Sequence, residues 1–354
     1  MLFSLKYDDE NPLFSVAFHP TEPQFVVGTA TGWVSCYSYD SKQPNESGEV
    51  VPVEKWTTKR HKGSCRAIVY NYEGTRVVTC GSEGVIKVCN SDNGKVIKKT
   101  SFGKAAATAL SINEEYIVTG DENAVITVYK HDLTVHQVYK LQDDNIDSIS
   151  VIKPLRVNKH NFVVGCNTFV LRLDVRKPEI AVKSADQEDE VLSGCVCSDV
   201  YSAFGMSEGI LTVWKNKGLT DQQQRVKLSQ EGSVDSVLAG EVENTVIAGT
   251  SDGNFAKIDV VSGKVLYQIQ HAAEDVLYLD YDYEYRLVTA SMSVLKVWDI
   301  NEPEQLHDQK LALEKEKEKT ARGENKKRKS KTSNKKNKSK VVVEKENPFA
   351  DLLG

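Results

Sequence analysis

The chain has 354 residues, of which 40% are hydrophobic and 27% are charged, and its 45 Lys and Arg face 50 Asp and Glu for a net charge of −5. Residues 301–354 hold 15 basic and 10 acidic side chains, which leaves 30 and 40 in residues 1–300. Because the sequence lacks a membrane-length apolar run and a signal-peptide core, we expect a soluble protein that is not secreted. The seven Cys lack metal-ligand spacing, which predicts free thiols in a reducing compartment.

One sequence pattern recurs seven times between residues 25 and 300. Each copy has apolar residues, a small residue, a polar turn and then an alternating strand. The small residues are 40 to 52 positions apart, near the spacing of propeller blades, and they are Gly28, Cys80, Gly120, Gly165, Gly205, Gly249 and Ala290. A further strand precedes each copy, and another follows most of them. Seven units of four antiparallel strands predict an all-β fold, a seven-bladed β-propeller.

The ends of the repeat region predict how the propeller closes. After Ile300 the seventh unit has no fourth strand, whereas residues 2–7 form a spare strand ahead of the first unit. We therefore expect residues 2–7 to complete the last blade, which removes an exposed sheet edge. Residues 1–300 are assigned to the propeller, and residues 301–354 to a charged, Lys-rich, disordered or partly helical tail.

The repeat region resembles the WD-repeat family over nearly all of residues 1–300. The resemblance rests on the unit spacing, on Trp214 and Trp298 at strand ends, and on the Trp-Asp pair that Trp298 forms with Asp299. It implies structural roles for these three residues. The family's Gly-His pair is missing, although His61 and His271 lie near its place, so we expect incomplete hydrogen-bond networks in most blades. In other units the Trp is replaced by Tyr37, Cys89, Tyr129, Asp174 and Ile258.

Two segments, 205–209 and 249–253, match the G-x-S-x-G pattern of a hydrolase nucleophile elbow. An elbow joins a strand to a helix, whereas both segments lead into another strand, so we interpret them as hairpin turns. Cys195 and Cys197 project from one face of a strand but lack further ligands, which favours buried thiols over a metal site. The sequence predicts no catalytic residue, no cofactor and no metal.

Residues 173–176 resemble the W-D-x-R box with which some WD-repeat proteins dock onto the adaptor of cullin-type ubiquitin ligases. The resemblance implies that Asp174 and Arg176 would contact that adaptor. Because Leu173 replaces the Trp of the box, we favour a plain strand end with a solvated Arg. A substrate receptor of such a ligase is the alternative function.

The tail is dominated by lysine. Between Lys315 and Lys340 the only hydrophobic residue is Ala321, so most of this stretch has no apolar surface to offset the entropy of ordering. Residues 302–319 could form a solvated helix. The tail contains two clusters that together hold nine basic residues and no acidic one. Such clusters are typical of nuclear and nucleolar targeting and of unspecific RNA contact. They contain Lys326, Lys327, Arg328, Lys329, Lys331, Lys335, Lys336, Lys338 and Lys340. The terminal apolar peptide, Phe349 to Leu353, is either a docking motif or without a role.

An acidic propeller with a Lys-rich tail and a terminal Phe-Ala-Asp-Leu peptide resembles the WD-repeat-containing protein fifty-five family and its fungal relatives. The opening unit, FSVAFHP to Gly28, adds to this match. The resemblance implies a non-enzymatic scaffold in the nucleus and nucleolus that acts in ribosome biogenesis and rRNA production. Its implied partners are proteins of pre-ribosomal or nucleolar assemblies, with a monomeric propeller inside a larger complex and no membrane.

Overall fold

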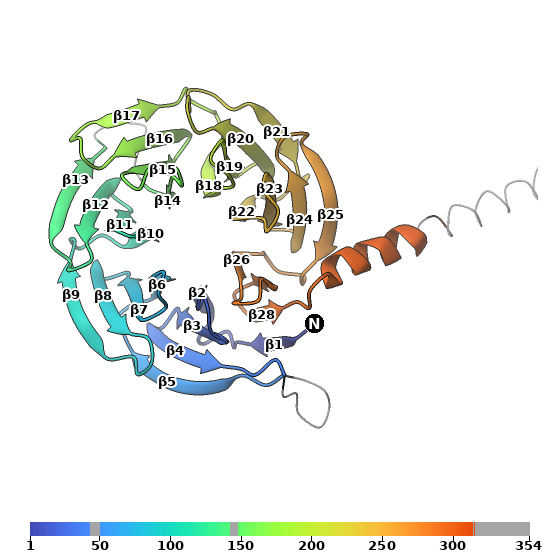
Figure 1. The fold of residues 1–354 in the computed structure, drawn as a ribbon, viewed down its shortest axis with the longest axis horizontal. Coiled ribbons are helices and arrows are strands. Elements are labelled where there is room, and N and C mark those ends of the chain that lie inside the picture. The colour runs from blue at the N-terminus through green and yellow to red at the C-terminus, as the bar shows by residue number, and fades with distance from the viewer. Residues whose placement is uncertain (43–49, 142–147, 314, 316–354) are drawn as a thin grey trace, which may run out of the picture. The chain divides into compact units, whose positions relative to one another are not determined.

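The computed structural model describes residues 1–42, 50–141, 148–313 and 315, and it divides into two compact units, Met1–Pro303 and Glu304–Gly354. The first unit contains 28 strands in seven four-stranded antiparallel sheets arranged around a ring (Figure 1). This confirms the seven-bladed β-propeller that the repeats predict. Residues 302–313 are helical.

The first four blades each run in chain order from the inner strand to the outer strand. Blade 1 has β2 (Leu13–Phe18), β3 (Gln24–Thr29), β4 (Trp33–Ser38) and β5 (Val53–Lys59). Blade 2 has β6 (Cys65–Tyr70), β7 (Arg76–Gly81), β8 (Val85–Asn90) and β9 (Val96–Ser101). Blade 3 has β10 (Ala107–Ile112), β11 (Tyr116–Asp121), β12 (Val125–Lys130) and β13 (Val135–Lys140). Blade 4 has β14 (Val151–Pro154), β15 (Asn161–Cys166), β16 (Phe169–Asp174) and β17 (Ile180–Lys183).

Blades 5 and 6 follow the same strand order, whereas the last blade takes its outer strand from the start of the chain. Blade 5 has β18 (Val191–Val196), β19 (Tyr201–Met206), β20 (Ile210–Lys215) and β21 (Gln224–Lys227). Blade 6 has β22 (Val234–Ala239), β23 (Thr245–Thr250), β24 (Asn254–Asp259) and β25 (Lys264–Gln270). Blade 7 has β26 (Tyr278–Tyr281), β27 (Leu287–Ala290), β28 (Val294–Val297) and, outermost, β1 (Phe3–Lys6).

The seam between blades 7 and 1 is closed by β1. This strand pairs antiparallel with β28, and Phe3 lies opposite Val297. The buried Phe3 ring stacks on Phe25 of blade 1 with 5.9 Å between the ring centroids, and it meets Tyr39 edge-on at 5.1 Å. The N-terminal strand therefore fills the place of the fourth strand that blade 7 lacks, and it joins the two ends of the ring.

Burial decreases from the inner strands of a blade to its outer strand. All six residues of β3 and of β11 are buried between neighbouring blades, whereas β5 and β9 are mostly exposed. Continuous apolar runs therefore become the central strands, and polar, Lys-containing runs become the rim. The outer strands β17 and β21 have only four residues each, and the sequence pattern does not predict them.

Packing between blades explains the small residue of the repeat. A Cβ at Gly28 would lie 2.6 Å from the Sγ of Cys65 in the next blade. A Cβ at Gly249 would lie 2.6 Å from a methyl carbon of Val276, which leads into the next blade. Real Cβ atoms do not approach other atoms this closely, so each position has to stay small for the neighbouring blade to pack against it.

Blade 4 departs from the register of the other blades. Its second hairpin has two residues, 167–168, where the corresponding hairpins have three. Gly165 pairs with Val170, and the residue three positions later is the fully buried Leu173. In blade 5, Gly205 pairs with Leu211, and the residue three positions after Leu211 is Trp214. The counterpart of the Trp in blade 4 is therefore Leu173, and the assignment of Asp174 to that place is wrong.

The antiparallel strands place the connecting loops at two ends of the ring. The described residues of end I belong to the connections between blades, 7–12, 60–64, 102–106, 141, 148–150, 184–190, 228–233 and 271–277, and to the second hairpins, 30–32, 82–84, 122–124, 167–168, 207–209, 251–253 and 291–293. Those of end II belong to the first hairpins, 19–23, 71–75, 113–115, 155–160, 197–200, 240–244 and 282–286, and to the third loops, 39–42, 50–52, 91–95, 131–134, 175–179, 216–223 and 260–263.

Candidate interaction surface

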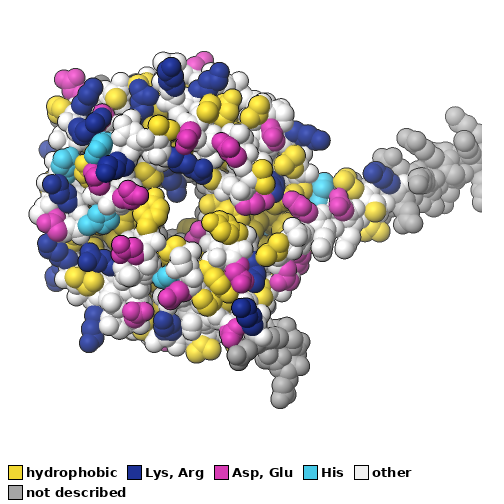
Figure 2. Space-filling view, in the orientation of Figure 1, with side chains coloured by type: hydrophobic (Ala, Val, Ile, Leu, Met, Phe, Trp, Pro, Cys, Tyr) yellow, Lys and Arg dark blue, Asp and Glu magenta, His cyan; other side chains and the backbone are white. Residues whose placement is uncertain are grey.

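A cavity of about 390 Å³ lies between the inner strands of the propeller, at end II. Its walls come from six blades, and most of them are apolar, including Val69, Leu110 and Leu279. On the face that Figure 2 shows, hydrophobic side chains gather around the opening at the centre of the ring. A concave, mainly apolar site with a few polar groups is the common form of a binding site.

Two charged side chains interrupt the apolar wall of this cavity, Lys153 in β14 and Asp280 in β26. Asp280 accepts hydrogen bonds from the backbone N–H groups of Phe18 and Tyr281, both at 2.9 Å. Burial raises the pKa of Asp280 to about 6, although the hydrogen bonds from these amides and the charge of Lys153 act to lower it. The cavity therefore offers one cation, and one carboxyl group whose charge changes in mild acid.

Exposed apolar side chains lie at the same end of the propeller as this cavity, and one of them, Tyr72, also lines it. They come from the first hairpins of five blades, with exposed fractions between 52% and 73%, and they are Tyr72, Val157, Val200, Val242 and Tyr285. Large apolar side chains gathered on one surface mark an interaction site. We call these five residues and the cavity walls the channel mouth. The repeat pattern does not predict these five residues, because each stands in a turn that contains polar residues.

End I has a different surface, on which carboxylates prevail. Its described loops contain fourteen Asp or Glu and three Lys or Arg, whereas those of end II contain fourteen and eight. The composition of the sequence indicates an acidic propeller but does not place the charge at one end, because the carboxylates come from loops of different units.

The ion pairs also differ between the two ends. At end II the carboxylate–base pairs include Glu115–Lys159, Asp174–Arg176, Glu241–Lys257 and Asp282–Arg286. Within the described part of the chain, the only ion pair between end I loops joins His61 to Glu83, with 2.8 Å between Nδ1 and Oε1. Burial lowers the pKa of His61, so this imidazole is neutral near pH 7. The negative charge of end I is therefore largely uncompensated.

Trp214 and Trp298 are both buried, but they make different hydrogen bonds. The indole N–H of Trp298 donates to the Oγ1 of Thr289 at 2.8 Å, and this oxygen lies 2.7 Å from the Nδ1 of His271. These are three members of the hydrogen-bond network that braces a WD repeat. The indole of Trp214 donates instead to Thr212 on its own strand, at 3.0 Å. Blade 7 thus has a chain of side-chain hydrogen bonds that blade 5 lacks.

The other polar residues that the sequence singles out are paired within the chain. Arg176 folds back onto Asp174, with 2.8 Å from Nε to Oδ1 and 2.6 Å from Nη2 to Oδ2. These hydrogen bonds lower the pKa of Asp174 to about 2. Asp299 accepts a hydrogen bond from the amino group of Met1 at 2.7 Å. The contact of Asp174 and Arg176 with a ligase adaptor stays a prediction.

Known proteins resemble the chain over most of its length. It is 33% identical to WD repeat-containing protein JIP5 of Meyerozyma guilliermondii, over 84% of this chain and 71% of the relative. The protein of the same name from Candida glabrata is 31% identical, over 83% and 70%, and that from Saccharomyces cerevisiae is 28% identical, over 82% and 76%. The chain belongs to the WD repeat-containing protein JIP5 family. No protein-family model matches it.

Membership of the JIP5 family makes the chain a WD-repeat propeller, a class of interaction scaffold. The two G-x-S-x-G segments are hairpin turns here, because Ser207 lies between β19 and β20 and Ser251 between β23 and β24. Ser207 donates a hydrogen bond to Asp189 at 2.5 Å, and neither serine has a His partner among the described residues. Cys195 and Cys197 are buried free thiols. Over the same ranges, no group of three or more potential ligands could hold a metal ion.

Most of the tail of this JIP5 family member lies outside the described residues. This holds for all nine basic residues that the sequence predicts to act in targeting, from Lys326 to Lys340, and for the terminal peptide 349–353. Among the helical segments in the described ranges, none has the length and apolar character needed to cross a membrane.

Proposed function

We propose that the chain is a non-enzymatic scaffold of the nucleolus that holds proteins of pre-ribosomal assemblies together during ribosome biogenesis and rRNA production. The observation that carries the scaffold role is the channel mouth, an apolar cavity flanked by five exposed apolar side chains on a rigid ring. Such a ring presents surfaces without having to align reacting groups.

The nucleolar part of the proposal rests on the sequence. Nine basic residues between Lys326 and Lys340, without an acidic one, suit an import receptor and anionic RNA. The resemblance to the WD-repeat-containing protein fifty-five family supports the same compartment. Because the acidic propeller repels RNA, retention in the nucleolus requires a protein contact of the propeller in addition to the tail.

Imaging of tagged full-length variants tests the location. Neutral residues in place of Lys326, Lys327, Arg328, Lys329, Lys335 and Lys336 should leave a folded protein that stays in the cytoplasm. Concentration of this variant in the nucleolus would contradict the proposed role of the tail.

Affinity purification from cells tests the scaffold role. The double variant Tyr72→Ser/Tyr285→Ser removes two aromatic side chains of the channel mouth and should lose the propeller's protein partners. The matched control Val53→Ser/Val135→Ser changes two similarly exposed apolar residues on outer strands and should keep them. Equal partner sets for both double variants would exclude the channel mouth as the scaffold surface. Removal of residues 309–354 shows in parallel which partners need the tail.

A further inference from the structure

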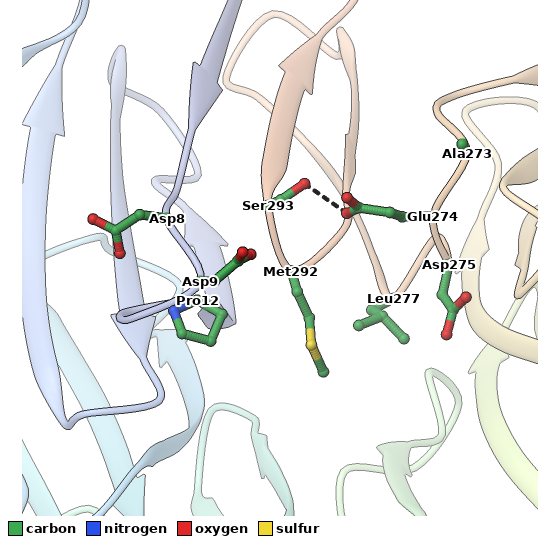
Figure 3. A pocket seen from close by; sticks show the side chains of 9 residues that line it. All are labelled: Asp8, Asp9, Pro12, Ala273, Glu274, Asp275, Leu277, Met292 and Ser293. Carbon is green, nitrogen blue, oxygen red and sulfur yellow. Dashed lines mark hydrogen bonds between the residues drawn. The ribbon is translucent and has the colours of Figure 1, made fainter.

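A second cavity lies at end I, on the seam between blades 7 and 1. It has a volume of about 440 Å³ and is lined by residues of the loops 7–12, 271–277 and 291–293. Apolar side chains, among them Pro12, Leu277 and Met292, line it, and Met292 is 46% exposed. In Figure 3 the Met292 and Leu277 side chains lie between Asp9 on one side and Asp275 on the other. We call this site the seam cavity.

Four carboxylates stand among the apolar residues of the seam cavity: Asp8, Asp9, Glu274 and Asp275. Asp8 accepts a hydrogen bond from the backbone N–H of Asn11 at 2.8 Å, and Glu274 accepts one from the Ser293 hydroxyl at 2.6 Å. Among the described residues, no Lys or Arg forms an ion pair with any of the four. The charge of the cavity is therefore available to a ligand, in contrast to the paired carboxylates of end II.

The loops that form the seam cavity are held in place by backbone hydrogen bonds. The N–H of Tyr7 donates to the carbonyl of Ser293 at 2.7 Å, and the N–H of Leu13 donates to that of Met292 at 2.9 Å. The bond from Leu13 crosses the seam between blades 7 and 1, and the bond from Tyr7 extends the pairing of β1 with β28 inside blade 7, so the loops 7–12 and 291–293 keep their spacing. A site fixed in this way loses little conformational entropy when a ligand binds.

We propose that the seam cavity docks an extended segment of a partner protein that is rich in Lys or Arg and carries an aliphatic side chain. The aliphatic side chain packs against Met292 and Leu277. The methylene stems of the basic residues lie along the same apolar surface, and their cationic ends reach the carboxylates. This inference does not depend on the cellular location of the protein.

Other ligands fit the seam cavity less well. A metal ion needs several ligand atoms that converge on one point, and no group of three or more His, Cys, Asp or Glu in the described residues has that arrangement. Nucleic acid would be repelled by the four carboxylates and by the net charge of end I. A folded basic surface would meet the carboxylates but would leave the cavity empty, whereas a side chain from an extended segment fills it.

Binding of a fluorescent peptide to the full chain tests the proposal. The probe is a short peptide in which Lys and Leu alternate, and its binding is followed by fluorescence anisotropy at low and at moderate salt. The variant Asp9→Asn/Asp275→Asn removes one charge from each side of the cavity and should weaken binding about tenfold. The matched control Glu190→Gln/Glu231→Gln removes two exposed charges elsewhere on end I and should change it less than about twofold.

Two further measurements separate docking from general attraction between charges. Met292→Ser should weaken binding of the Lys/Leu peptide but not of a peptide in which Ser replaces every Leu. Thermal unfolding of each variant should match that of the wild type, which excludes a loss of fold. The proposal is overturned by an absence of saturable binding to the wild type, by equal weakening in both double variants, or by a single-stranded RNA probe whose binding Asp9→Asn/Asp275→Asn abolishes.

Discussion

The two ends of the propeller carry equal numbers of described carboxylates in their loops, fourteen each, but use them differently. At end II four of them form ion pairs with Lys or Arg, which hold the loops in shape. At end I none of the fourteen pairs with a described Lys or Arg, and four of them line the seam cavity. Repeats of one architecture can thus form one end whose paired carboxylates stabilise the loops around an apolar cavity. They can also form an opposite end whose carboxylates remain available to a ligand.

The largest expected effect concerns the buried ion pair of end II. The Asp282 side chain is fully buried, and its Oδ2 accepts hydrogen bonds from Arg286 and from the Tyr39 hydroxyl, both at 3.0 Å. Arg286→Ala would leave this carboxylate without its cation and should lower the free energy of unfolding by about 3–5 kcal/mol. Denaturant unfolding measures this. Arg286→Lys keeps the charge and should restore part of the loss.

Two groups on opposite ends, the buried His271 and the partly exposed Asp280, should respond to pH with opposite signs. Burial lowers the pKa of His271 at end I to about 4, and Lys296 acts in the same direction. The unfolded chain therefore takes up this proton first, near pH 6.5, and stability is lost as pH falls to about 4, by up to about 3 kcal/mol. Asp280 at end II has its pKa raised, so its contribution is present at low pH and is lost as pH rises through about 6.

A comparison of variants separates the two contributions. His271→Gln should remove the acid-dependent loss, so that unfolding midpoints measured from about pH 7 to pH 4 fall less steeply than those of the wild type. Parallel curves for the variant and the wild type would mean that His271 titrates normally in the folded state.

A smaller effect is expected at the indole of blade 7. Trp298→Phe keeps an aromatic ring in the core but removes the hydrogen bond to Thr289, which should cost about 1 kcal/mol beyond the change in packing. The matched variant Trp214→Phe removes a bond to Thr212 that leads to no histidine. Double-mutant cycles with His271→Gln then test whether the network is cooperative. The loss in free energy of unfolding for His271→Gln/Trp298→Phe should be smaller than the sum of the two single losses, whereas the losses for His271→Gln and Trp214→Phe should add.

The smallest effect belongs to the unpaired carboxylates of end I. Asp9→Asn/Asp275→Asn breaks no ion pair with a described residue, so the free energy of unfolding should change by less than about 0.5 kcal/mol. Any change should be a gain at low salt, because repulsion among the carboxylates is relieved. A clear loss of stability in chemical denaturation would show that end I, like end II, uses its carboxylates to hold the fold.

Periodicity in the sequence is sufficient to predict the blades, because burial between blades imposes the same pattern on every unit. It fails where a local choice breaks the pattern. The two-residue hairpin at 167–168 shifts the register of blade 4, and the strands β17 and β21 have only four residues each, which is too short for their alternation to be recognised.

The surfaces are harder to predict because they are assembled across blades. Tyr72 and Tyr285 stand in turns more than two hundred positions apart, and only the closed ring brings them to the same end. The carboxylates of the seam cavity come likewise from both ends of the propeller sequence, Asp9 from its start and Asp275 from its last unit.

The closure by β1 also sets an order in time. Phe3 leaves the ribosome before the rest of the propeller, and its partner Val297 follows 294 positions later. At about 5–20 residues per second this interval lasts about 15–60 s, during which β1 has no strand to pair with and Phe25 lacks the ring that covers it in the finished fold. The seam cavity, whose walls come from both sides of this junction, is therefore among the last features of the nascent protein to form.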